Sequence, residues 1–467
     1  MTNLTEGLKV NEKERDASVD FKKTKTMTDC NTKIKKKVKS KIIERDQWSG
    51  PFDFIVSMIA YAVGLGSFLL VYVIFFSLGA LPVFIMEITI GQYAQRGAME
   101  IWNLCPLFKG VGIGNVVIAF MCIAYFCVIS SWSIFYMINS FSSVFPWETC
   151  NNWWNDRTCI TGREDAIEIS EIRTNLSKYN LTTETSVEQY WERRVLMQTS
   201  SISNFGGIQW ELLGIMTLTW IIVYFALWKG ITRARRFVYF CALSPYFMLA
   251  ILLLRGLTLP GATVGIYFYL TPNATKLWDI TVWKDAGTQV SISSLPYFKY
   301  TFHLSVRNKM RDSNEMLMII LARRNTNVLS FVVFSILGYM SVLVDKNIAE
   351  IVKPGPGLAF LAYPEVASNL PLKQLWSMLF FLMITILGLD SQICMLEGLY
   401  TALEDVFPHF LRKYKKTSLA LTCLFFFILG IPMAGSYWLI LFDAYGASGI
   451  ALLFVVFFEI TGLSWGF

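Results

Sequence analysis

The stretch Leu387-Gly-Leu-Asp-Ser-Gln392 places a carboxylate inside an apolar run that covers residues 375–399. A run of about 20 mainly apolar residues is long enough to cross a bilayer as a helix. An ionisable side chain at that depth is costly and usually serves an ion or a proton path. Asp390 is therefore the first candidate functional residue. The alternative is a structural pair between Asp390 and a neighbouring hydrogen-bond donor.

The rest of the chain has the same apolar character. Of 467 residues, 54% are hydrophobic and only 16% are charged, whereas soluble domains carry roughly a quarter charged residues. The sequence therefore predicts an all-α polytopic membrane protein. Besides 375–399, the apolar runs expected to span the bilayer are 111–142, 212–228, 237–254, 329–344, 418–435 and 437–466.

Composition argues against metal chemistry and against an enzyme. The chain has two histidines, and its nine cysteines include no CxxC pair, so a zinc site or a histidine general base has no sequence support. Asp390 beside Ser391 could suggest a hydrolase, but no histidine lies near either residue in the sequence. We expect no enzymatic activity and no organic cofactor.

The distribution of positive charge predicts which segments lie in the cytoplasm. Residues 1–46 hold thirteen lysines and arginines against eight acidic residues. Such a tail could bind nucleic acid, but it lacks interleaved aromatic residues and directly precedes an apolar segment, which favours a cytoplasmic tail and no nucleic-acid partner. We therefore divide the chain into a tail with a gate motif (1–48) and a transmembrane domain (49–467). The short basic connections expected on the same side are 229–236, 307–311 and 412–416.

Two other connections are expected outside the cell, 143–207 and 344–372. Three glycosylation sequons begin at Asn175 and Asn180 in 143–207 and at Asn273 in the connection after 237–254, and at each of them the charge rule independently predicts the exterior. An oxidising compartment makes a disulfide between Cys150 and Cys159 the expected state. Two free loop thiols are the alternative.

Residues 52–89 do not fit a regular count of spans. The flanking segments are both expected in the cytoplasm, so the chain should cross an even number of times. The piece 52–66 reaches only about 22 Å as a helix, short of a roughly 30 Å core, and no polar turn separates it from 68–89. The sequence predicts either a defective hairpin or one long span.

Several motifs together identify a family. They include Arg45-Asp-Gln-Trp48, Ala60-Tyr-Ala-Val-Gly-Leu-Gly66, Glu87 with Gly91-Gln-Tyr93, and the Leu387–Gln392 stretch. In order and spacing the chain resembles the neurotransmitter:sodium symporters. The resemblance implies an inverted-repeat fold like that of the bacterial leucine transporter, with helices one and six broken near the midplane. Unwound carbonyls at such breaks bind Na⁺.

The resemblance also implies binding residues, with Na⁺ and Cl⁻ as co-transported ions. The residues expected at sodium are Ala60, Ala62, Val63, Leu387, Asp390 and Ser391, the last two supplying side chains to the metal ion. Those expected at chloride are Tyr72, Gln289 and Thr326. Those expected at the solute are Tyr61, Gly64, Gly66, Tyr125 and Phe126. Those expected at the gates are Arg45, Trp48, Asp405 and Asp443.

The chain departs from the family pattern in places that matter for transport. After Gly66 the family continues with a sodium-binding asparagine and the outer-gate arginine, but here Ser67 begins an apolar stretch. The tyrosine that contacts a substrate carboxylate aligns with Phe126. Helix six lacks its glycine-rich stretch after Gln289. We expect damaged helices one and six, and the sequence ends at Phe467, without helices eleven and twelve.

Two functions follow from this resemblance. The first is sodium- and chloride-coupled symport of a small zwitterionic solute of the GABA, taurine or betaine class across the plasma membrane, because Gly64 suits a substrate with its own carboxylate. The second is a non-transporting paralogue or isoform that associates with full-length transporters. Both place a multi-pass protein in the lipid bilayer with a cytoplasmic N-terminus, and a homo-oligomer is possible for either.

Overall fold

The computed structural model describes eleven stretches of the chain, all within one of its two compact units, Gln47–Phe467; the other is Met1–Asp46. The described residues are 71, 74–94, 99–161, 184–199, 207–228, 231–270, 283, 326–344, 357–434, 436–442 and 450–465.

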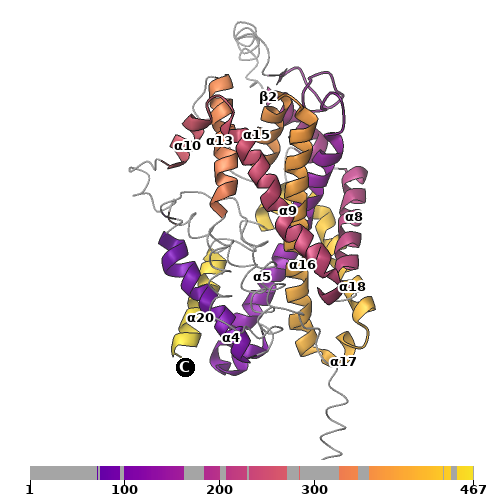
Figure 1. The fold of residues 1–467 in the computed structure, drawn as a ribbon. Coiled ribbons are helices and arrows are strands. Elements are labelled where there is room, and N and C mark those ends of the chain that lie inside the picture. Colours follow the sequence, from indigo (N-terminus) through magenta and orange to yellow (C-terminus); the bar gives the residue numbers. More distant parts are fainter. Residues whose placement is uncertain are drawn as a thin grey trace, which may run out of the picture. The chain divides into compact units, whose positions relative to one another are not determined.

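The described residues are mainly helical (Figure 1). The longer α-helices are α4 (Leu81–Ala94), α5 (Lys109–Asn139), α8 (Trp210–Leu227), α9 (Ile231–Leu257), α10 (Ala262–Leu270), α13 (Thr326–Val344), α15 (Gly357–Ser368), α16 (Lys373–Val406), α18 (Lys415–Gly430) and α20 (Ile450–Trp465). Short α-helices are α7 (Ser186–Gln189), α17 (Pro408–Leu411) and α19 (Ser436–Leu441). The 3₁₀ and π segments are η1 (Phe76–Ala80), η2 (Glu100–Asn103), η3 (Pro106–Phe108), η4 (Tyr190–Val195) and η6 (Ile431–Ala434).

Four described helical segments are long and apolar enough to cross a membrane. They are Pro106–Asn139, Trp210–Leu227, Lys373–Val406 and Lys415–Ala434. These segments confirm helices at the predicted runs 111–142, 212–228, 375–399 and 418–435. The predicted run 329–344 is helical as α13, and 437–466 is described as α19 and α20, with 443–449 outside the described residues.

A fifth candidate span is bent. Its two helical segments, Leu243–Leu257 and Ala262–Tyr269, are bent by 113° relative to one another. Pro260 lacks an amide donor, and Gly261 has a φ of +89° that a larger residue would adopt only with strain. A side chain at Gly261 would also collide with Val342 of α13. The prediction that a simple span covers 237–254 was therefore incomplete, because the helix also begins earlier, at Ile231, within the basic stretch.

The core is built around α5 and α16, which pack along one another (Figure 1). Both helices also contact α8, and α16 contacts α9. Where α5 meets α16, Ser140 Oγ and Ser377 Oγ are hydrogen-bonded at 2.8 Å, and Gln392 Nε2 donates to the Ile123 carbonyl at 3.3 Å. These polar contacts fix the register of the two helices inside an otherwise apolar cluster.

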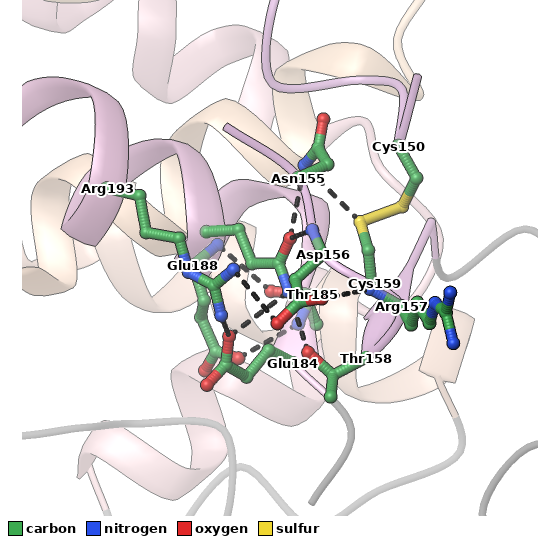
Figure 2. A network of polar contacts seen from close by, with 11 residues as sticks. Cys150, Asn155, Asp156, Arg157, Thr158, Cys159, Glu184, Thr185, Glu188 and Arg193 are labelled. Carbon is green, nitrogen blue, oxygen red and sulfur yellow. Dashed lines mark hydrogen bonds and ion pairs between the residues drawn. A yellow bond between two sulfur atoms is a disulfide. The ribbon is translucent and has the colours of Figure 1, made fainter. Parts of the chain in front are cut away.

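The segment predicted to lie outside the cell is folded in the part that is described. Strand β1 (Cys159–Ile160) pairs in parallel with β2 (Glu184–Thr185), and Cys150 is bonded to Cys159 with Cα atoms 5.9 Å apart. Figure 2 shows the polar network beside this disulfide. The buried Gln189 holds it together, since its Nε2 donates to Thr158 Oγ1 at 2.9 Å and its Oε1 accepts from Asp156 N at 3.0 Å.

Residues 52–89, which did not fit a count of spans, are described only in their second piece. There, η1 and α4 form one short apolar helix, Phe76–Gly91. The piece 52–66 lies outside the described residues. The predicted damage to helix one, and likewise to helix six, therefore stays a prediction.

Candidate functional site

The site begins with one face of α16. Leu387, Asp390 and Ser391 stand at positions i, i+3 and i+4, so their side chains lie on the same side of the helix. Asp390 is buried with 2% of its surface exposed. Leu387 and Ser391 are partly exposed, so this face of α16 is only partly covered by the rest of the protein. The structure thus brings together the three predicted sodium residues that it describes.

The Asp390 carboxylate is short of hydrogen-bond partners. Its Oδ2 atom is buried and accepts no hydrogen bond from any described residue. Cys241 and Tyr246 of α9 lie near enough to interact with it electrostatically, and neither carries a positive charge. A buried carboxylate without a partner is costly. A sodium ion bound at Oδ2 would remove that cost, so the residues present fit a cation.

Close packing against α5 holds this face in place. Gly388 lies against Ser130, and an added Cβ would collide with Ser130 Oγ and lie 3.3 Å from Ser130 Cβ. Gln392 is bonded to the α5 backbone four residues further along α16. Asp390 therefore stands between two fixed contacts, which leaves its turn of helix little freedom.

The predicted solute residues on α5 lie on the same central helix pair. Tyr125 is buried, and Phe126 is partly buried and packs against the core cluster. Phe126 has no hydroxyl group, so it cannot donate the hydrogen bond that a tyrosine would give to a carboxylate.

The predicted cytoplasmic gate residue Asp405 has a described cation beside it. Arg412 Nη2 lies 3.7 Å from Asp405 Oδ1, and Arg412 Nε lies 3.4 Å from Glu404 Oε1. Sequence reasoning placed Asp405 at the gates together with Arg45 and assigned Arg412 only to a basic cytoplasmic connection. The short helix α17 separates Arg412 from the last turn of α16, and the ion pairs show that Arg412 lies beside that turn. No sequence spacing predicts that contact.

Most of the other predicted site residues lie outside the described part of the chain. These are Arg45, Trp48, Ala60, Tyr61, Ala62, Val63, Gly64, Gly66, Tyr72, Asn175, Asn180, Asn273, Gln289 and Asp443. Thr326 begins α13, but its side chain is not described. Sequence reasoning, in turn, missed Cys241 and Tyr246. Nothing in the spacing of α9 marks the two as neighbours of Asp390.

Known proteins match the chain over most of its length. The model of the sodium:neurotransmitter symporter family matches residues 45–467. A sodium- and chloride-dependent betaine transporter of Caenorhabditis elegans is 62% identical over 445 residues, covering 91% of this chain and 74% of the relative. A taurine transporter of Rattus norvegicus is 39% identical over 453 residues (90% and 71%). A GABA transporter 2 of the same species is 37% identical over 450 residues (91% and 73%). The apolar helices, the buried Asp390 on α16 and these matches together show that the chain belongs to the sodium:neurotransmitter symporter family.

Proposed function

We propose that this protein couples the movement of Na⁺ and Cl⁻ to the uptake of a small zwitterionic solute across the plasma membrane. The observation that carries the proposal is the buried Asp390 carboxylate, whose Oδ2 has no described partner, on the same helix face as Leu387 and Ser391. Inside an apolar helix such a group favours an ion. The backbone of helix one, at Ala60 to Val63, would complete the sodium shell.

Betaine is the first solute to test, followed by taurine and GABA. The 62% identical relative is named a betaine transporter, and the less similar relatives are named taurine and GABA transporters. All three solutes carry one cationic and one anionic group. Gly64 brings no competing carboxylate to the predicted solute site, while Phe126 leaves the solute's anionic group without a tyrosine hydroxyl at that position.

The test is uptake of radiolabelled betaine, taurine and GABA by cells that make the protein. We expect saturable uptake that is lost when choline replaces Na⁺ and reduced when gluconate replaces Cl⁻. Cells without the protein supply the background. Saturable uptake that is unchanged by replacing either ion would contradict the coupling. The protein would then be a carrier whose transport does not depend on Na⁺ or Cl⁻.

A non-transporting role is the second candidate, and the length of one alignment bears on the departures that suggest it. The alignment with the nematode relative extends over 445 positions, which exceeds 91% of 467 residues. The relative therefore has residues at aligned positions where this chain has none. The helix-one segment after Gly66, which carries a sodium-binding asparagine and the outer-gate arginine in the family, is the predicted place of such a loss.

Restoring that segment separates the two candidates. If the native chain is a symporter that has lost its transport activity, inserting the relative's residues after Gly66 should raise uptake of the preferred solute from background to a saturable rate. Equal uptake by both chains would instead mean that the lost segment is dispensable. Surface biotinylation should accompany both measurements, so that uptake is compared at equal amounts of protein at the cell surface.

The proposed topology makes a prediction about glycosylation. The connection 143–207 should face the exterior, so removal of N-glycans should increase the gel mobility of the native chain. We expect Asn175→Gln with Asn180→Gln to remove most of that shift, because these are the two sequons in the connection. Asn152→Gln, which changes an asparagine of the same connection outside any sequon, is the control. A native chain with unchanged mobility would refute the topology.

A further inference from the structure

Helices α8 and α18 pack against one another, and each leaves an apolar face exposed (Figure 1). Between them the rings of Trp220 and Phe426 stack, with their centroids 6.1 Å apart. On the other side of each helix, exposed apolar side chains recur about one turn apart, so each set shares one face. The two sets are Leu218, Ile221 and Phe225 of α8, and Leu421, Leu424, Phe425 and Ile428 of α18.

Positive charge gathers where α8 ends and α18 begins. Trp228 follows the last residue of α8, and Lys416 belongs to the first turn of α18. Lys416 Nζ lies 5.3 Å from the centre of the Trp228 ring, which places the two helix ends side by side. Lys413 and Lys416 are both exposed, and neither forms an ion pair with an acid of the described chain. The acids at the end of α16 are paired with Arg412 instead.

The distribution of polar and apolar groups along α18 matches one leaflet of a bilayer. Phe410 and Tyr414 are exposed beside the lysines, and Lys413 Nζ lies 5.2 Å from the centre of the Tyr414 ring. Exposed aromatic rings and lysines are typical of the boundary between hydrocarbon and headgroups. Ile428 stands twelve residues beyond Lys416, or about 18 Å along the helix axis. Half of the roughly 30 Å hydrocarbon core is about 15 Å, so the exposed face of α18 has the length of one acyl chain.

We propose that this end of the α8–α18 pair binds an anionic glycerophospholipid. Its phosphate pairs with Lys413 and Lys416, and its acyl chains lie along the exposed face of α18. An ammonium group without an acid partner is a good partner for a phosphate. Phosphatidylcholine brings its own cation and has no net charge, whereas phosphatidylserine keeps a net negative charge that two lysines can offset. The inference takes its leaflet from the proposed topology, in which 412–416 faces the cytoplasm and its anionic lipids, and it does not depend on solute transport.

A second copy of the chain is the other occupant that an apolar face could take. Two copies have the same orientation in a membrane, so a symmetric contact through this face would bring the same residues of both copies together. The lysines of both copies would then lie at the same depth, where like charges repel. A phospholipid supplies the opposite charge at that depth, and the observations therefore favour the lipid.

The first test is photolabelling of the purified full chain with phosphatidylserine that carries a diazirine on one acyl chain. We expect adducts on peptides that contain residues 218–225 or 421–428, and suppression of this labelling by excess unlabelled phosphatidylserine. Phosphatidylcholine should compete much less, and glycerophosphoserine, which has the headgroup without acyl chains, should not compete. Labelling absent from both segments would overturn the proposal. Equal competition by phosphatidylcholine would reduce the site to a general lipid contact, and competition by glycerophosphoserine would assign it to a soluble anion; either result also overturns the proposal.

The second test asks whether the lysines select the lipid. In Lys416→Gln, we expect competition by phosphatidylserine to need about fivefold more lipid, the factor expected for one lost lysine contact. Lys416→Arg should compete like the native chain, because arginine keeps the charge and stacks on Trp228. Lys109→Gln, at an exposed lysine where α5 begins, is the control and should also compete like the native chain.

Two results of the second test would contradict the proposal. Equal competition in Lys416→Gln and in the native chain would remove the lysine from lipid binding, and an equal loss in Lys109→Gln would show only an effect of net charge. Leu424→Cys provides a separate check on the occupant. Disulfide-linked dimers through residue 424, together with loss of the lipid labelling, would assign the face to a second copy.

Discussion

Replacing Asp390 by asparagine is expected to abolish the stabilisation of this protein by Na⁺. Ligand binding to the folded state alone stabilises it by about 2.7 kcal/mol when the ligand is at one hundred times its Kd. Asp390→Asn keeps the size of the side chain but removes the charge that attracts the ion. The measurement is the melting temperature in NaCl and in choline chloride, with the purified protein in detergent.

The same variant should not lose stability in choline. In the native chain Asp390 Oδ2 is buried without a described partner, and removing an uncompensated buried charge relieves a cost of desolvation. Loss of the Na⁺ response together with unchanged or higher stability in choline would therefore separate an ion ligand from a structural acid. A structural acid would lose stability in both salts.

Glu397→Gln is the matched control. Glu397 is a buried acid on the same helix, two turns or about 10 Å further along its axis. At that distance it cannot contact an ion held at Asp390. We expect it to keep the full Na⁺ response. A Na⁺ response that survives in Asp390→Asn would remove Asp390 from ion binding.

Adding one methyl group at Gly388 is expected to separate α5 from α16 and to disable the sodium site. The new Cβ would collide with Ser130 Oγ, and although that oxygen can rotate, Ser130 Cβ would remain at 3.3 Å. Overpacking of this kind costs about 1–3 kcal/mol. Since Asp390 stands two residues away, we expect both a lower melting temperature and a weaker Na⁺ response.

A second substitution should reverse this effect. In Ser130→Gly with Gly388→Ala, the nearest neighbour left to the new Cβ is the Cα of residue 130 at 3.7 Å, an ordinary contact. The double variant should recover most of the Na⁺ response. Gly214→Ala of α8 is the control, because a Cβ there meets nothing within 4 Å. If Gly388→Ala behaves like Gly214→Ala, then close packing at Gly388 does not hold the site.

The helices themselves could be predicted because the apolar runs are long. A run such as 375–399 has few alternatives to crossing the bilayer as a helix, since every backbone amide must be satisfied within the segment. The boundaries of these helices were predicted less accurately than their existence. The helix α9 begins at Ile231 inside a basic stretch. The turn at Gly261 bends the chain strongly, and a count of apolar residues does not predict such a bend.

By itself the sequence determined the all-α membrane class and the family, and it predicted Asp390 as an ion ligand, because each depends on residues that are adjacent or one turn apart. Only the tertiary structure decided which side chains face them from other helices. The position of Cys241 in electrostatic range of Asp390 and the ion pair between Arg412 and Asp405 are of this kind. The periodicity of a helix fixes which of its own residues share a face. The neighbours of that face depend on how two helices pack and rotate against each other, and small contacts such as Gly388 on Ser130 set that rotation.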